Sequence, residues 1–424
     1  MSKKEMFKNV IATFNERSLP ELIERSLEVP RHEKIITISG VRRSGKTFLF
    51  YQLISQLMQD GVPKERIVYV NFEDDRLFPL SFSDLQDLID AYYEMYPSFV
   101  NEQKYFFLDE VQEIEHWQKF VRRLHDTERV SLYITGSSSK LMSSEVPTAL
   151  RGRTLTYTLF PMDFHEFLRF KGVQLQDHYA HSSQRYLLVN SLIEYIDYGS
   201  FPEVIKEPEL KTKMLQDYYD LVIFRDIVER HEIRNTYALK AILKYLLTNV
   251  SNLFSLNKYL KMEKPNIQVS KNTLSDYVSY IIASGLVYFV PIYSHSLKVQ
   301  QVNPVKVYCI DTGLRNAVSL KFSGDLGRLV ENIVFVELLR RGFEIFYWKQ
   351  THEVDFVVKD RMGDLYAFNV SYTNEVLPRE SEGIREVEEE LPIKQSLIVT
   401  RDLAKTMDGV TCIPLWRWLL DKTA

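Results

Sequence analysis

The feature that most constrains this chain is a glycine-rich loop between a short apolar strand and a helix. Residues 34–39 (KIITIS) predict a buried strand, residues 40–47 read GVRRSGKT, and the leucines that follow recur at four-residue spacing, as on one face of a helix. The loop matches the pattern G-x-x-x-x-G-K-[ST], in which backbone N–H groups surround a phosphate at a helix N-terminus. The sequence therefore predicts a phosphate-binding P-loop.

The residue types of this loop suit a nucleoside triphosphate with Mg²⁺. Gly40 and Gly45 remove side-chain bulk, Lys46 can bridge the β- and γ-phosphates, and the Thr47 hydroxyl can ligate the metal. A GTPase is expected to carry N-K-x-D, whereas residues 257–260 read NKYL, so we expect ATP. The expected nucleotide contacts are Gly40, Val41, Arg42, Arg43, Ser44, Gly45, Lys46 and Thr47, with salt bridges as an alternative use of the two arginines.

A second apolar strand ends in the acids that such a site requires. Residues 105–110 read YFFLDE, so Asp109 is the expected magnesium partner of Thr47. Glu110 is placed to polarise the attacking water, and Gln112 can help to position it. Alone, the two acids would fit a solvated strand end equally well.

About five apolar strands alternate with helices in the first third, which predicts an α/β fold with a parallel sheet and its ligand at the carboxyl ends of the strands. A charged helical pattern precedes them and ends near Pro30. After the fourth strand, Thr135 or Ser137 is expected to sense the γ-phosphate, with ordinary turn chemistry as the alternative. Arg153 is a candidate phosphate contact, in its own chain or in a neighbouring subunit, or a solvated basic turn residue.

The motifs GVRRSGKT, FFLDEVQ, TGSSS and LRGR, in this order, resemble those of the prokaryotic AAA-type ATPases of the STAND-related archaeal group. The resemblance continues through YGSFPE at residues 198–203 and RDIVER at residues 225–230. It implies an AAA-like ATPase with a C-terminal domain of unknown function that has a restriction-endonuclease-like fold.

The length of 424 residues predicts about three domains. We expect an ATPase core at residues 1–160, a helical lid at 161–235, a winged-helix-like module at 236–300 and a nuclease-like domain at 301–424. The charged N-terminus favours a cytoplasmic protein, and two cysteines are too few for a disulfide framework or a four-cysteine zinc site. Residues 277–297 lack Asp, Glu, Lys and Arg, but their Ser, Gly, Pro and His residues argue against a membrane span.

The module at residues 236–300 shows helix, turn and helix patterns before an apolar hairpin, as in a winged helix that binds duplex DNA. Its candidate DNA contacts are Lys258, Lys271 and Asn272. The near-neutral charge permits only local contact with DNA, so a protein partner or a homo-oligomer is an equal alternative.

In the last third, Glu331 on a helix and Asp355 on a strand match two positions of a metal-dependent nuclease site. Asn369 and Ser371 stand where the pattern expects Glu and Lys, so we expect no nuclease activity. The acids Glu331, Glu353 and Asp355 would then be remnants or part of a partner surface. The leading prediction is an ATP-driven switch, and the alternatives are an ATP-regulated DNA-binding protein and a nuclease.

Overall fold

The computed structural model describes residues 1–136, 150–263, 269–319, 325–373, 375–407 and 409–421. The chain forms two compact units, Met1–Phe160 and Pro161–Ala424. Among the helices of the described ranges, none has the length and apolar character needed to cross a bilayer. Residues 277–297 instead contain a helix end, a turn and a short strand.

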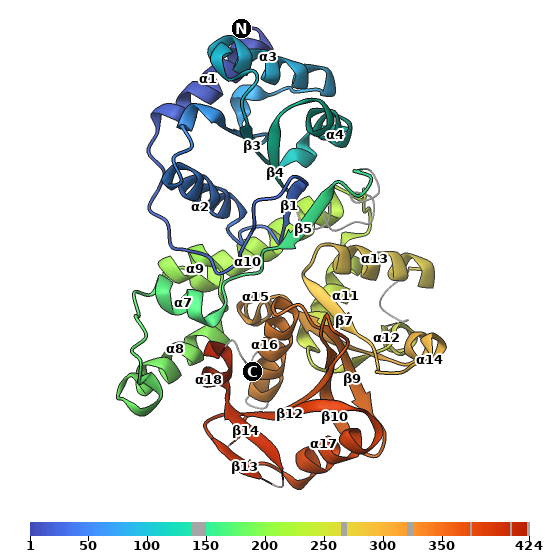
Figure 1. The fold of residues 1–424 in the computed structure, drawn as a ribbon. Coiled ribbons are helices and arrows are strands. Elements are labelled where there is room, and N and C mark those ends of the chain that lie inside the picture. Colours follow the sequence, from blue (N-terminus) through green and yellow to red (C-terminus); the bar gives the residue numbers. More distant parts are fainter. Residues whose placement is uncertain (137–149, 264–268, 320–324, 374, 408, 422–424) are drawn as a thin grey trace. The chain divides into compact units, whose positions relative to one another are not determined.

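A parallel five-stranded sheet forms the centre of the first unit (Figure 1). Its order is β2-β3-β4-β1-β5, so the P-loop strand lies between β4 and β5. This confirms the predicted α/β class. The strands are β1 (Ile35–Ser39), β2 (Ile67–Asn71), β3 (Lys104–Asp109), β4 (Val130–Thr135) and β5 (Thr154–Thr158), and the main helices are α1 (Lys3–Glu16), α2 (Lys46–Gln59), α3 (Leu85–Met95) and α4 (Trp117–Thr127).

Both faces of this sheet are covered by apolar side chains, which is why its central strands read as almost continuous apolar runs. One cluster joins the sheet to α1, α3 and α4, and a second joins it to α2. The N-terminal helix ends at Glu16, earlier than the pattern up to Pro30 predicts. Leu19, Leu27 and Val29 of the following segment pack against the α2 cluster, so the apolar residues that prolonged the pattern are used by a non-helical segment.

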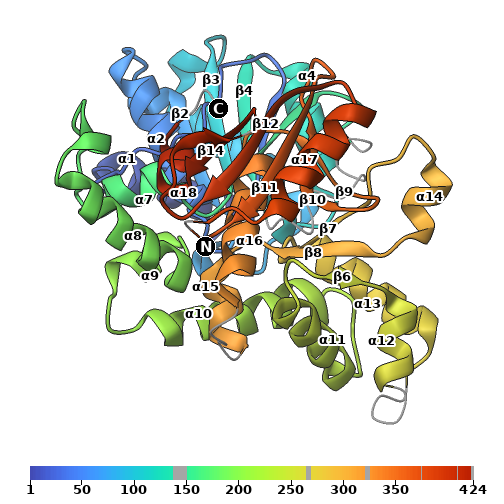
Figure 2. The same cartoon turned by 90° about the horizontal axis from the view of Figure 1, so that it is seen from below.

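The second unit begins with helices and continues into a small three-stranded sheet of order β6-β8-β7. Figure 2 shows α11, α12 and α13 grouped beside this sheet. In chain order the elements are α7 (Phe164–Phe170), α8 (Gln184–Tyr198), α9 (Pro202–Lys206), α10 (Lys211–Leu221), α11 (Thr236–Thr248), β6 (Leu253–Phe254), α12 (Leu256–Glu263), α13 (Lys271–Ala283), β7 (Val287–Val290), α14 (Leu297–Val302) and β8 (Val305–Cys309).

A mixed six-stranded sheet of order β13-β14-β12-β11-β10-β9 forms the rest of the second unit. Strand β11 is antiparallel to β10 and parallel to β12. The elements are α15 (Thr312–Val318), α16 (Leu326–Arg340), β9 (Glu344–Lys349), β10 (Glu353–Lys359), β11 (Leu365–Ser371), α17 (Pro378–Glu390), β12 (Ile393–Thr400), β13 (Lys405–Met407), β14 (Val410–Pro414) and α18 (Leu415–Leu420). The expected boundaries at residues 235 and 300 stay predictions.

The YGSFPE motif at residues 198–203 connects α8 to α9 and binds the start of α15. Gly199 ends α8 with φ of 70°, and a Cβ on it would lie 2.0 Å from Oδ1 of Asp311. The Asp311 carboxylate accepts from the Ser200 N–H at 2.8 Å and from the Leu314 N–H at 3.0 Å. Burial raises the pKa of Asp311 to about 6, although these hydrogen bonds oppose the shift. The motif thus fixes the end of α8 against the start of α15.

Candidate active site

The P-loop follows β1 with the backbone shape that a phosphate cradle needs. Arg43 has φ of 67° and Gly45 has φ of 97°, both in the left-handed region. A Cβ on Gly40 would lie 2.3 Å from the Leu159 carbonyl oxygen, so the backbone at this position leaves no room for a side chain. Helix α2 then starts at Lys46 and directs its first N–H groups toward the loop.

Lys46 crosses this loop with its side chain almost fully buried. Its ammonium donates to Gly40 O at 3.2 Å, and it lies 3.7 Å from Glu110 Oε1. Beside it, Ser44 Oγ is buried, and no hydrogen-bond partner for it lies in the part of the chain that the structure describes. A charged donor and an unsatisfied hydroxyl are therefore both available at the loop.

Asp109 ends β3 directly beside the P-loop, since parallel strands bring their carboxyl ends to one edge. The Thr47 hydroxyl donates to Asp109 Oδ2 at 2.7 Å, and the Tyr69 hydroxyl donates to the same oxygen at 3.0 Å. Thr135 donates to the other carboxylate oxygen. Burial first, and then the charge of Glu110, raise the pKa of Asp109, and the three hydroxyl hydrogen bonds oppose this shift.

Glu110 is held in a left-handed conformation, with φ of 53°, that turns it out of the strand. Its N–H donates to Thr135 Oγ1 at 3.0 Å, and its carboxylate accepts from the amide of Gln112. The structure therefore brings Lys46, Thr47, Asp109, Glu110 and Gln112 together, as the sequence predicts for these positions. Because the Thr135 hydroxyl has a single proton, which it gives to Asp109, Thr135 acts as a link between the two acids.

Two other predicted residues are not part of this group. Ser137 lies outside the described residues. Arg153 precedes β5 and accepts the Ile35 N–H at its carbonyl, so it lies at the end of the sheet opposite the P-loop. Its guanidinium pairs with Asp126 at 2.8 Å. The prediction that Arg153 contacts a phosphate within its own chain is therefore wrong, whereas a contact in a neighbouring subunit stays a prediction.

Arg25 is a site residue that the sequence did not reveal. It is buried, and its guanidinium donates to the Ser44 carbonyl at 2.6 Å and to the Phe160 carbonyl at 2.8 Å. Its backbone exchanges hydrogen bonds with the side chain of Gln52 on α2, at 2.8 and 3.2 Å. Arg25 thus ties the N-terminal segment to the back of the P-loop. By contrast, Arg42 pairs with Glu73 at 3.3 Å, as its alternative use in salt bridges predicts.

The donor set at the P-loop fits one Mg²⁺ shared with a nucleotide. A threonine hydroxyl and a buried carboxylate are oxygen ligands, and Mg²⁺ is usually held by one or two carboxylates, waters and phosphates. Within the described residues there is no group of three or more His, Cys, Asp or Glu that could hold an ion alone.

A second polar group lies in the C-terminal unit, around Lys306 of β8. The Lys306 ammonium lies 2.9 Å from Asp355 Oδ1, 2.9 Å from Glu353 Oε1 and 3.1 Å from Glu331 Oε1. Burial would lower the pKa of Lys306, but the carboxylates raise it well above its usual value. Burial and the charge of Asp355 raise the pKa of Glu331 to about 7.

The predicted nuclease positions Glu331 and Asp355 are thus brought together, but with an ammonium between them. Asn369 accepts the Asp355 N–H at 2.9 Å and donates to the Glu380 carbonyl at 3.0 Å, so its side chain is hydrogen-bonded to backbone groups of β10 and α17. A divalent metal does not fit this group, since Lys306 already occupies the point where the carboxylates converge. The one feature of the sequence that could have pointed to this arrangement is the lysine within the apolar strand VKVYC.

Three protein-family models match parts of this chain. Residues 32–168 match the AAA domain family AAA_14, residues 189–325 match a domain of unknown function (DUF8612), and residues 326–418 match another (DUF4143). The uncharacterized protein MJ1544 of Methanocaldococcus jannaschii is 33% identical over 99% of this chain and 96% of its own length. An uncharacterized protein of Haemophilus influenzae is 32% identical over 91% of this chain and 94% of its own length. Among solved structures, the Walker-type ATPase paby2304 of Pyrococcus abyssi is similar with a TM-score of 0.43 and 11% identity, over 74% of this chain and 94% of that one.

Proposed function

The chain belongs to the same family as the uncharacterized protein MJ1544 of Methanocaldococcus jannaschii and contains an AAA domain, and from that premise we propose that it hydrolyses ATP with Mg²⁺ as a nucleotide-dependent switch. The observation that carries the proposal is the meeting of Lys46, the Thr47–Asp109 pair and Glu110 beside a left-handed glycine loop. These are the parts that phosphoryl transfer to water requires: a cradle with a cation, a metal ligand pair and a base.

In this mechanism the P-loop N–H groups and Lys46 bind the phosphates. Lys46 exchanges its contacts with Gly40 and Val41 carbonyls for phosphate oxygens, which offer charge-assisted hydrogen bonds. Thr47 and Asp109 would hold Mg²⁺, which when bound supplies positive charge to the phosphate oxygens. The Glu110 carboxylate accepts a proton from the attacking water, and Gln112 fixes the orientation of that carboxylate.

Nucleotide binding tests the first part of the proposal. Titration with a fluorescent ATP analogue should show saturable binding by the wild type and a loss of at least tenfold in affinity for Lys46→Ala, because a charge-assisted contact to phosphate is removed. Lys119→Ala changes an exposed lysine in the same unit and should bind like the wild type. Equal affinity of all three proteins would refute the assignment of the loop. Asp109→Asn should weaken the dependence of binding on Mg²⁺.

DNA binding regulated by ATP is the second candidate function. It is supported by the element order α11-β6-α12-α13-β7-α14-β8 and the sheet order β6-β8-β7, which resemble a winged-helix module with an added short helix before β8. Lys271 and Asn272 are exposed at the start of α13, and Lys258 is exposed on α12. Retention of duplex DNA that depends on ATP and decreases with salt would support this candidate. A protein partner, a homo-oligomer and a cytoplasmic location remain predictions.

The nuclease alternative is disfavoured by the ammonium of Lys306 at the carboxylates. The order α16-β9-β10-β11-α17-β12 supports the proposal of a nuclease-like fold. Because Lys306 lies where the carboxylates converge, a metal that could act as a Lewis acid on a phosphodiester would have no place among them. Cleavage of DNA by the purified protein with Mg²⁺ or Mn²⁺, abolished in Asp355→Ala, would overturn this view.

A further inference from the structure

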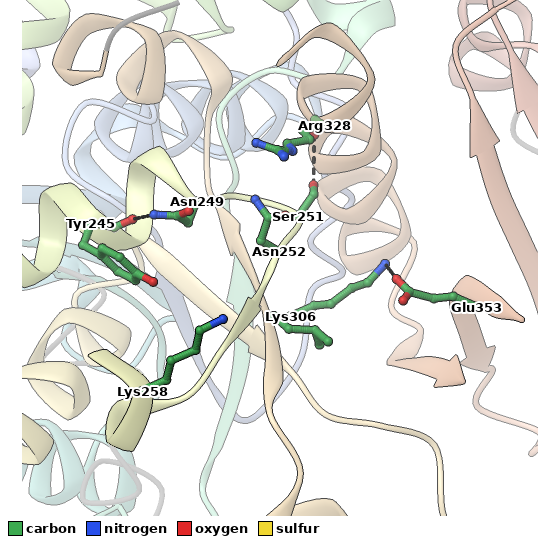
Figure 3. A pocket seen from close by; sticks show the side chains of 9 residues that line it. Tyr245, Asn249, Ser251, Asn252, Lys258, Lys306, Arg328 and Glu353 are labelled. Atoms are coloured by element: carbon green, nitrogen blue, oxygen red, sulfur yellow. Dashed lines mark hydrogen bonds and ion pairs between the residues drawn. The ribbon is translucent and has the colours of Figure 1, made fainter. Parts of the chain in front are cut away.

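A polar groove of about 410 Å³ opens beside Lys306 in the C-terminal unit (Figure 3). Its walls come from the end of α11 and the turn after it, from α12, from β8, from the start of α16 and from β10. The lining residues are Tyr245, Asn249, Ser251, Asn252, Leu253, Lys258, Lys306, Arg328 and Glu353. Only one of these side chains is acidic, and three are basic.

Two of the three cations remain available to a ligand. Lys258 is exposed and has no ion pair or hydrogen bond with the described residues, and its ammonium points into the groove in Figure 3. Arg328 is about half exposed, and its contact is with Asp325 at 3.5 Å. That carboxylate is already bound at 2.7 Å by the buried Arg315, so the charge of Arg328 is only weakly offset.

The remaining polar groups also favour an oxygen-rich anion. Asn249 and Asn252 each donate to a neighbouring backbone carbonyl, at 2.8 and 3.3 Å, which anchors the amides at the wall of the groove. Ser251 donates to the Arg328 carbonyl at 3.0 Å and so fixes the turn against α16. The Tyr245 ring packs against Tyr259, with 4.8 Å between ring centroids, and its hydroxyl lies near the Lys258 side of the groove. A phosphate group accepts from such donors through several oxygens.

The carboxylates next to the groove would repel an anion if they were uncompensated. Lys306 lies between Glu331, Glu353 and Asp355, and Lys349 adds a second contact to Glu353 at 3.2 Å. The ammonium therefore performs the electrostatic task of a bound cation, and it does so permanently. A phosphate near Lys258 and Arg328 then meets three carboxylates whose charge is partly offset by two lysines.

We propose that this groove binds a phosphate ester, with Lys258 and Arg328 as the contacting cations and Lys306 as the resident cation that partly offsets the adjacent carboxylates. The phosphate is carried by a nucleic-acid strand or by a free nucleotide, and the two sources share the same contacts. The site is distinct from the P-loop, and it includes Arg328 of α16, which lies outside the winged-helix-like elements. It therefore goes beyond the proposed ATPase activity.

The experiment measures binding of a short fluorescein-labelled single-stranded DNA by anisotropy at several salt concentrations. It uses the full chain with Lys46→Ala as background, so that the P-loop does not contribute. Lys258→Ala and Arg328→Ala should each weaken binding several-fold and lower the slope of log affinity against log salt by about 0.7, as expected for one lost phosphate contact on a single strand. Lys261→Ala is the matched control, because Lys261 is exposed on the same helix and does not line the groove.

Two further measurements distinguish the two sources of the phosphate and test helix α13 as an alternative binding surface. Competition by adenosine monophosphate that depends on Arg328 would identify a free nucleotide as the ligand, whereas its failure to compete would identify a strand. Lys271→Ala tests helix α13, since a loss confined to this variant would place the DNA there and overturn the groove. The proposal is also overturned if neither probe binds, if Arg328→Ala keeps the wild-type affinity and salt slope, or if Lys261→Ala loses as much as Lys258→Ala.

Discussion

Replacement of Lys306 by methionine should destabilise the C-terminal unit strongly. Methionine keeps much of the volume of the buried stem but removes an ammonium that contacts three carboxylates at 2.9–3.1 Å. The Lys306 side chain is only 2% exposed, so solvent cannot replace it fully. Removing one partner of a buried ion pair costs about 3–5 kcal/mol, because the opposite charge is left uncompensated.

The size of the effect should depend on pH. Glu331 has a pKa of about 7 in the folded protein, so below that value a proton already neutralises one of the three carboxylates. The loss in Lys306→Met should therefore be larger at pH 8 than at pH 5. Adding Asp355→Asn should recover part of the stability, because the double variant removes charge from the same cluster.

Thermal unfolding followed by tryptophan fluorescence is a suitable assay, since Trp348, Trp416 and Trp418 lie in the C-terminal unit and Trp117 lies in the first. A loss of 3–5 kcal/mol corresponds to a decrease of roughly 10 °C in Tm for a unit of this size. Lys394→Met is the control, because its pair with Asp364 is exposed and should contribute less than about 1 kcal/mol. Equal and small shifts for both variants would refute the electrostatic account of the Lys306 cluster.

Three further predictions concern single residues. Gly40→Ala should abolish ATP binding and lower Tm, because its Cβ would meet the Leu159 carbonyl at 2.3 Å, and calorimetric titration with ATP checks this. Arg25→Met should weaken ATP binding at least several-fold by releasing the back of the P-loop, whereas Arg31→Met, at an exposed pair, should bind like the wild type in the same titration. In the wild type the raised pKa of Glu331 contributes stability that is fully present below about pH 4.5 and is lost as pH rises through about 7. Glu331→Gln cannot lose this proton, so its Tm should decrease less than that of the wild type between pH 5 and pH 8.

The sequence predicted the parts of the fold and of the site that follow from local patterns and from the regular geometry of a parallel sheet. The P-loop pattern and the buried strands gave the parallel sheet, and from its geometry the meeting of Thr47 with Asp109 follows, because parallel strands end at one edge. The prediction of a helix that ends near Pro30 was wrong in length, since the apolar residues after Glu16 pack in a non-helical segment.

Contacts that neither a local pattern nor the sheet geometry determines were not predictable in the same way. Lys306 meets Glu331 and Asp355 from positions 25 and 49 residues away, and no local pattern relates a lysine in an apolar strand to those acids. The Arg25 guanidinium donates to the Ser44 carbonyl of the P-loop. A contact to a backbone carbonyl leaves no signature in the side chains of the loop. In both cases packing of separate elements, and not local preference, determines the partner.

Single-turnover hydrolysis of ATP in the presence of Mg²⁺ tests the central claim most directly. The wild type should convert bound ATP to ADP. Glu110→Gln should bind ATP with nearly unchanged affinity and hydrolyse it about 10²–10⁴ times more slowly, because the glutamine cannot accept the proton of the attacking water. Hydrolysis at the wild-type rate in Glu110→Gln, or in Lys46→Ala, would contradict the account.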